Sequence, residues 1–230
     1  LQYQAIAARD QKKNPAASRE ALWLAAETFE KIKQPEQALK IYQQYSADTT
    51  NPVDLRAEAV YRIYTYNDKN NLVTEAQSSL KNLAQIYDKL GDKAPPRIRY
   101  FGALAHFKMT QPLYDNFAAI TLKQPLKPNL LAKKKAMQAA LIAYNQVANI
   151  GVAEFTTAAN YQQAQIYQKL AADLIASEKP KGLSDLELEQ YGILLEEQAE
   201  PLANKAIDIY TANANLVKQD VYDGFVQKSF

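Results

Sequence analysis

The sequence of 230 residues has no cysteine, a single histidine and only six glycines. The absence of cysteine excludes disulfide bonds, zinc sites with thiolate ligands and cysteine nucleophiles. One histidine excludes a metal site built from several histidines of one chain. No apolar run approaches the roughly 18 residues of a membrane-spanning helix, so we expect no transmembrane segment.

The chain also lacks an excess of either charge, because 27 lysines and arginines balance 25 aspartates and glutamates to leave a net charge of +2. This balance gives no strong attraction to nucleic acid, so we expect no nucleic-acid partner. The sequence starts at Leu1, and no basic stretch followed by an apolar segment precedes Asp10. We therefore expect that a targeting segment has been removed.

Support for catalysis is weak. His106 lies beside Ala105 and Phe107, and no motif supplies a partner that could make it a general base. Acidic pairs such as Glu196 and Glu197 are typical of solvated helix faces. No glycine belongs to a phosphate-binding motif. We expect no enzyme activity, no catalytic residue, no metal and no cofactor.

Helical periodicity dominates the chain, and most of the ten prolines lie between periodic segments, where helices begin or end. The expected helices cover residues 2–13, 17–33, 35–48, 53–68, 71–90, 96–110, 112–122, 129–149, 152–178, 184–217 and 219–228. Pro201 should kink or split its helix near Glu200. Gly102, inside a helix, indicates a close approach of two helices. The predicted class is all-α.

Small and bulky residues repeat with a recognisable spacing in residues 19–52. The positions are Leu22, Ala25, Ala26, Phe29, Ala38, Tyr42 and Tyr45. This pattern resembles the tetratricopeptide repeat, a pair of antiparallel helices that stacks with its neighbours. A second, weaker unit aligns Tyr64 with Phe29, and its turn is then three residues longer than the family expects.

The resemblance implies an irregular tetratricopeptide-like solenoid, a right-handed superhelix of about ten helices in one domain over residues 1–230. The better-matching units lie near residues 19–52, 54–90, 129–178 and 184–217, with an irregular insert near 91–128. The alternative is a helical bundle without repeats.

The C-terminal third, residues 152–230, contains the stretches EFTTAANYQQAQIY, KPKGLSDLELEQYGILLEEQAEPLANKAIDIY and VYDGFVQKSF. It resembles the tail of bacterial envelope tetratricopeptide proteins related to gliding-motility lipoproteins. The resemblance implies a periplasmic or outer-membrane-associated scaffold, in a complex linked to a proton channel of the biopolymer-transport type. A cytoplasmic location stays an open alternative.

A partner-binding groove is the function that the repeat positions favour. In the family, one face of the first helices lines the groove, and an aromatic residue among charges is typical of a binding hot spot. The candidate residues are Glu20, Trp23, Glu27, Glu30, Glu58, Arg62, Tyr161 and Gln165. Packing of Trp23 against the helix expected at residues 2–13 is the competing interpretation.

Lysines supply a second candidate surface. Lys133, Lys134 and Lys135 are consecutive, and Arg97, Arg99 and Lys108 could join them in a basic patch; a solvated helix margin is the alternative. Lys134 shares a stripe with apolar residues of its helix, so we expect its ammonium group to reach solvent or an acidic partner.

The sequence thus predicts a non-enzymatic scaffold that binds a protein or peptide in a bacterial envelope assembly. A different class stays open, namely a periplasmic accessory domain that binds glycan or peptidoglycan on exposed aromatic rings. An enzyme would instead need a buried acidic pair in a cleft near His106 or a lysine.

Overall fold

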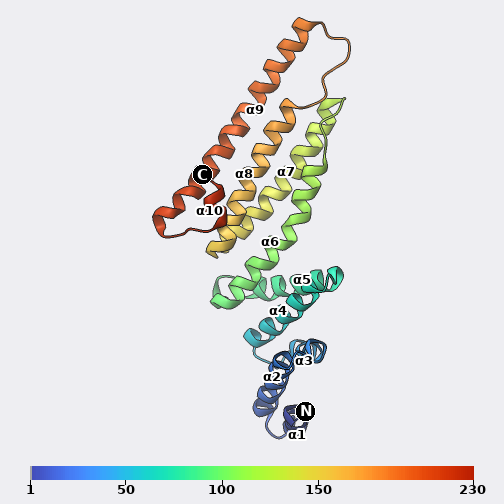
Figure 1. The fold of residues 1–230 in the computed structure, drawn as a ribbon, viewed down its shortest axis with the longest axis vertical. Coiled ribbons are helices and arrows are strands. Elements are labelled where there is room, and N and C mark those ends of the chain that lie inside the picture. The colour runs from blue at the N-terminus through green and yellow to red at the C-terminus, as the bar shows by residue number, and fades with distance from the viewer. Residues whose placement is uncertain (1) are drawn as a thin grey trace. The chain divides into compact units, whose positions relative to one another are not determined.

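The structure is a computed structural model that describes residues 2–230. Over this range the chain forms ten α-helices and two short 3₁₀ helices, with no strand (Figure 1). The predicted all-α class is confirmed. The α-helices are α1 (Gln2–Asp10), α2 (Pro15–Lys31), α3 (Pro35–Ala47), α4 (Val53–Lys69), α5 (Val73–Leu90), α6 (Pro96–Ala119), α7 (Leu126–Asn149), α8 (Ala153–Ile175), α9 (Asp185–Ala214) and α10 (Gly224–Lys228). The 3₁₀ helices are η1 (Gly91–Lys93) and η2 (Asn215–Gln219).

The chain divides into two compact units, unit 1 (Leu1–Ala105) and unit 2 (His106–Phe230). The boundary falls inside α6, which contributes residues 96–105 to unit 1 and residues 106–119 to unit 2.

Unit 1 is a series of helices in which each packs on the next from α1 to α5. Alanines occupy the helix crossings, and Ala26, Ala57 and Ala59 are fully buried. Small side chains at these positions let helix axes approach closely. Apolar residues of α2, α3 and α4 form one core cluster around Tyr42, and residues of α4, α5 and α6 form a second around Phe101.

The turns after α2 and α4 have the same geometry. Lys33 and Asn71, 38 residues apart, both adopt a positive φ, of 58° and 57°. In each turn the next backbone N–H donates to a carbonyl five residues earlier, from Gln34 to Phe29 at 2.8 Å and from Leu72 to Asn67 at 2.9 Å. Two successive hairpins therefore close in the same way.

This equivalence corrects the predicted alignment of the second repeat. Asn67, not Tyr64, is equivalent to Phe29, because both accept the closing hydrogen bond of their turn. Ala38 and Ala76 then match, also at a spacing of 38 residues, and both are buried. The predicted longer turn is wrong. The prediction placed the equivalent of Phe29 at Tyr64, three residues before Asn67, because Tyr64 continues the apolar spacing of its helix.

Unit 2 places α8 between α7 and α9. Tyr144 and Val147 of α7 and Ile166 and Leu170 of α8 are fully buried. The short helix α10 packs against both α8 and α9. It is much shorter than the helix predicted over 219–228.

A buried polar network holds α10 in place. Asn213 is fully buried, and its Nδ2 donates to the carbonyl oxygen of Thr157 at 3.1 Å and to Ser229 Oγ at 3.0 Å. Thr157 Oγ1 donates to Asp223 Oδ2 at 2.6 Å. The other oxygen of Asp223 accepts two backbone N–H groups at the start of α10. Because its polar groups are paired, this network stabilises one arrangement of the C-terminal segment.

Two prolines lie inside helices without ending them. The predicted break between residues 110 and 112 is wrong, because α6 continues through Pro112. Thr110 and Phe117, seven residues apart on either side of it, are both buried. Packing of that face outweighs the hydrogen bond that proline removes. Likewise, α9 is one helix through Pro201.

Tyr144 provides a test of the core of unit 2. Its side chain is fully buried, and its hydroxyl has no hydrogen-bond partner in the described chain. Burial raises the pKa of Tyr144 above its ordinary value. Since only the unfolded state ionises readily, the stability of the fold does not depend on the ionisation of Tyr144 below pH about 10 and falls as the pH rises further.

We expect Tyr144→Phe to leave the melting temperature at pH 7 unchanged or higher, because it removes an unpartnered buried hydroxyl. It should also reduce the loss of stability above pH about 10. Thermal unfolding followed by circular dichroism between neutral and alkaline pH measures both effects. Tyr222→Phe, at an exposed position, is the control. A clear drop in the melting temperature of Tyr144→Phe at pH 7 would contradict the expectation.

Candidate interaction surface

Charged side chains from α2, α4 and the start of α6 meet in unit 1 as a charge ladder of Glu30, Arg62, Glu58 and Arg97. Arg62 Nη1 lies 3.4 Å from Glu30 Oε2, and Arg62 Nε lies 3.2 Å from Glu58 Oε1. Arg97 Nε lies 2.9 Å from Glu58 Oε2. Alternating charges thus connect three helices that are far apart in the sequence.

The two arginines of the ladder retain hydrogen-bonding capacity. Arg97 donates to both carboxylate oxygens of Glu58, at 2.9 and 3.2 Å, and this hydrogen bonding raises its pKa. Each arginine uses two of its five N–H donors in the ladder. Their side chains are 40% (Arg62) and 54% (Arg97) exposed. A further acceptor can therefore bind without displacing the existing pairs.

Arg97 also lies over a group of aromatic rings. Its guanidinium carbon is 4.4 Å from the ring centroid of Phe101, 5.2 Å from that of Tyr61 and 5.6 Å from that of Tyr100. Tyr61 and Phe101 stack at 4.7 Å. From the sequence, Arg97 was expected only in a possible basic patch. Its spacing from Tyr100 and Phe101, at i+3 and i+4 on one helix, is the signal that indicates this cluster.

Trp23 is a packing residue rather than an exposed anchor. It is half-buried, and its indole lies edge-on to Tyr42 and Tyr45 at centroid distances of 5.4 and 5.2 Å. Its Nε1 donates to Glu27 Oε1 at 3.1 Å. The indole therefore packs on α3, against the core cluster of α2, α3 and α4.

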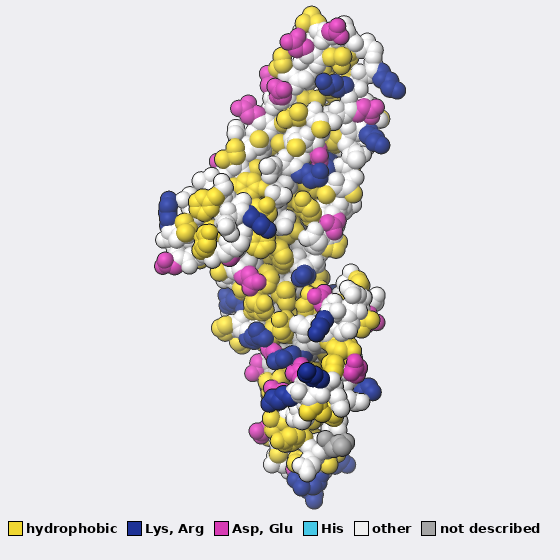
Figure 2. All heavy atoms as spheres, viewed as in Figure 1, with side chains coloured by type: hydrophobic (Ala, Val, Ile, Leu, Met, Phe, Trp, Pro, Cys, Tyr) yellow, Lys and Arg dark blue, Asp and Glu magenta, His cyan; other side chains and the backbone are white. Residues whose placement is uncertain are grey.

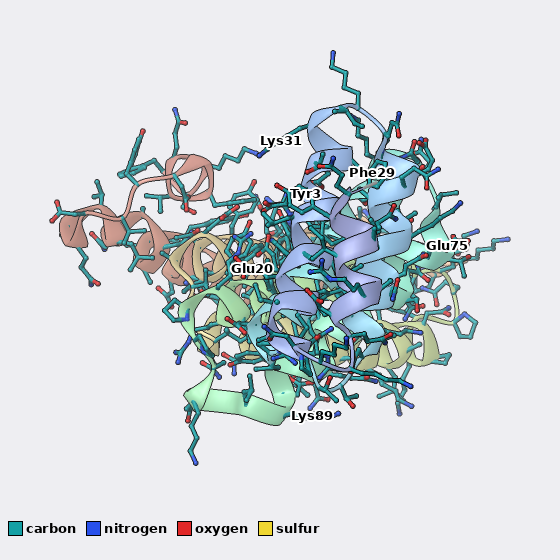
Figure 3. The ribbon with its side chains drawn as sticks, turned by 90° about the horizontal axis from the view of Figure 1, so that it is seen from below. Tyr3, Glu20, Phe29, Lys31, Glu75 and Lys89 are labelled. Atoms are coloured by element: carbon teal, nitrogen blue, oxygen red, sulfur yellow. The ribbon has the colours of Figure 1, made fainter. Side chains whose placement is uncertain are left out.

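Glu20 is the most exposed of the candidates on α2. Its position, seven residues before Glu27, puts both on one side of the helix. Figure 3 views the N-terminal end of unit 1, with Glu20 labelled on α2 apart from Phe29 near the end of the same helix. Glu20 therefore extends the acidic side of this surface.

Tyr161 and Gln165 belong to unit 2 and form a separate cluster. Gln165 Nε2 donates to Tyr210 Oη at 2.8 Å and to Tyr161 Oη at 3.1 Å. The ring of Tyr161 lies 5.6 Å from that of Tyr210 and 5.8 Å from that of Phe225. These contacts join α8 to α9 and α10, so both residues take part in internal packing.

Lys133 does not contribute to an exposed basic patch, because it is fully buried. Its Nζ donates to the backbone oxygens of Phe117 at 3.0 Å and Ile120 at 2.7 Å, and it lies 2.7 Å from Asp173 Oδ2. The buried face of the helix thus holds Lys133 rather than Lys134, whereas the expected access of the Lys134 ammonium group to solvent agrees with its exposed position. Lys134 and Lys135 are exposed.

A cavity of about 520 Å³ lies between α1, α2 and the end of α3. Its polar lining includes Arg19, Gln44, Asp48 and Asn51, and the lining described for it contains no aromatic ring. Sugar binding by stacking needs such a ring, so this cavity gives no support to the glycan-binding alternative.

Residues 2–230 hold no cluster that fits a metal site. No three histidine, cysteine, aspartate or glutamate side chains of that range converge as metal ligands would. Over the same residues, no helix combines the length and the apolar character that crossing a membrane requires. His106 is half-buried on α6. Its backbone carbonyl oxygen accepts a hydrogen bond from Thr110 Oγ1 at 2.8 Å.

Comparisons with protein-family models, with curated proteins and with solved structures give no match.

Proposed function

We propose that this chain is a non-enzymatic helical scaffold that binds a protein partner along α2, α4 and α6 of unit 1. The observation that supports the proposal is the exposed charge ladder, with Arg97 over Tyr61, Tyr100 and Phe101. Arginine and tyrosine are enriched among the residues that dominate binding energy at interfaces.

Binding at this surface is geometric and includes no chemical step. The unused N–H donors of Arg62 and Arg97 can take carbonyl or carboxylate oxygens of an extended segment or a helix. Acidic Glu20, Glu27 and Glu30 on α2 favour basic side chains beside them. A tetratricopeptide-like scaffold in a bacterial envelope complex linked to a proton channel is the biological setting that we propose.

Photo-crosslinking from position 20 in the cells that make the protein tests this function. We expect a defined protein to be captured by the wild type and lost in Arg62→Ala/Arg97→Ala. Both arginine side chains are at least 40% exposed, so we expect the variant to stay folded, which circular dichroism checks. Arg99→Ala, on the same helix as Arg97, is the matched control and should keep the partner.

Unchanged capture by the double variant would contradict the proposal. Absence of a protein partner, together with retention of the purified chain on peptidoglycan, would favour the glycan-binding alternative instead.

A further inference from the structure

The beginning of α9 is a helix with one uncovered apolar face. The first buried residue of α9 is Leu195, ten residues after its start at Asp185. Before that point, Leu186, Ile193 and Leu194 are 64%, 50% and 58% exposed. Figure 1 shows this part of α9 (orange) reaching beyond the end of α8 within unit 2.

The three exposed residues share one side of the helix. At 100° per residue, Leu186, Ile193 and Leu194 lie within an arc of about 100°. Leu195 and Ala199, which face the core, lie on the opposite side. The apolar residues, with Gln190 between them on the same side, therefore form a stripe, which we call the α9 stripe, and burying its apolar side chains against a partner is favourable.

Acidic residues border the α9 stripe, and one of them, Glu197, lies within its arc. Residues 185–200 contain six exposed carboxylates and no lysine or arginine, whereas the whole chain has a net charge of +2. The six are Asp185, Glu187, Glu189, Glu196, Glu197 and Glu200. In Figure 2, acidic and hydrophobic side chains adjoin one another at this end of unit 2, and basic side chains also lie there; two of the lysines near the start of α9, Lys179 and Lys181, precede the helix.

Only part of this charge has a role in the helix itself. Glu187 accepts the backbone N–H and the hydroxyl of Ser184, both at 2.8 Å, in a capping box. Carboxylates in the first turn also interact favourably with the helix dipole. Glu196 and Glu200 lie beyond the first turn, and like charges four residues apart destabilise a helix. A partner with positive charge would remove that repulsion.

We propose that the α9 stripe and its acidic border bind a basic amphipathic helix of another protein. The 16 residues from 185 to 200 span about 24 Å, which matches a partner helix of roughly four turns. Leucine-like side chains of the partner would cover the stripe, and its lysines or arginines would face the carboxylates. Antiparallel pairing with a second copy would oppose like charges, and an anionic membrane would be repelled.

A synthetic 18-residue peptide tests this surface independently of the surface proposed on unit 1. The peptide has leucines on one helical face, lysines elsewhere and a fluorescent label, and its binding to the full chain is followed by anisotropy. We expect Leu186→Ser/Ile193→Ser and Glu196→Gln/Glu200→Gln each to weaken binding about tenfold or more. Added salt should also weaken it.

Matched controls separate a defined site from general attraction. Leu131→Ser/Ile142→Ser removes two exposed apolar residues of α7, 71% and 54% exposed, and should change affinity less than twofold. A scrambled peptide of the same composition, without the helical periodicity, should bind at least tenfold more weakly. Circular dichroism confirms that each variant is folded.

Equal affinity for the wild type and the α9 variants would overturn the proposal, as would equal binding of the scrambled peptide. Dimerisation in sedimentation experiments that is lost in Leu186→Ser/Ile193→Ser would assign the stripe to a second copy. Binding to phosphatidylglycerol vesicles with the same loss would assign it to a lipid surface. Either result would contradict a basic protein helix as the occupant.

Discussion

Lys133→Met is expected to lower the free energy of unfolding by about 3 to 5 kcal/mol. The ammonium group of Lys133 is fully buried, pairs with Asp173 and caps two carbonyls at the end of α6. Methionine fills similar volume but leaves the carboxylate of Asp173 without its buried partner and the carbonyls of Phe117 and Ile120 without this donor. Urea unfolding followed by circular dichroism measures the difference.

Lys134→Met is the matched control, because it makes the same substitution at the exposed neighbour and should change stability by less than about 0.5 kcal/mol. Adding Asp173→Asn to Lys133→Met should recover part of the loss, since it removes the half-buried carboxylate, which without Lys133 keeps only its pair with Lys169. Equal stability of the Lys133 and Lys134 variants would show that the buried ion pair does not stabilise unit 2.

Gly102→Ala is expected to destabilise the protein by about 1 to 3 kcal/mol, through overpacking between α5 and α6. An added Cβ would lie 2.5 Å from Tyr87 Cβ and 2.7 Å from Tyr87 Cδ1, well inside van der Waals contact. A loss of stability would be diagnostic, because replacing glycine by alanine inside an unobstructed helix normally raises the free energy of unfolding by about 1 kcal/mol. Thermal and urea unfolding both report it.

Gly192→Ala provides that unobstructed comparison. Gly192 lies inside α9, and no atom is within 4 Å of a Cβ added there. The same substitution should therefore stabilise at residue 192 and destabilise at residue 102. A gain in stability at both positions would disprove close packing of Gly102 on Tyr87.

Helix content was predictable from the sequence because it depends on local properties. Periodic apolar positions and prolines at helix starts predict α3 and α4 to within one residue, and Gly102 correctly indicated close helix packing. The predicted break at Pro112 fails because burial of Thr110 and Phe117 stabilises α6 across it. The cost of a proline is local, whereas the compensating packing comes from the tertiary structure.

The candidate site was predictable only in part. The repeat spacing predicted Glu30, Glu58 and Arg62 on one surface. In the structure Arg62 lies 3.4 Å from Glu30 and 3.2 Å from Glu58. The same spacing could not show that Trp23 packs on two tyrosines of α3. The burial of Lys133 depends on its ion pair with Asp173, a residue 40 positions later in the chain. The predicted rotation of the helix was off by one residue, so that Lys134 was placed on the face where Lys133 lies.

The network around Asn213 affects the order in which the protein forms during synthesis. All residues of the two core clusters of unit 1 lie within the first 105 residues. Unit 1 can therefore fold while unit 2 is still being translated. Unit 2 needs Asp223 and Ser229 to pair Thr157 and Asn213. Until residue 229 has left the ribosome, Thr157 and Asn213 lack these two hydrogen bonds, and the surface under α10 is accessible to chaperones.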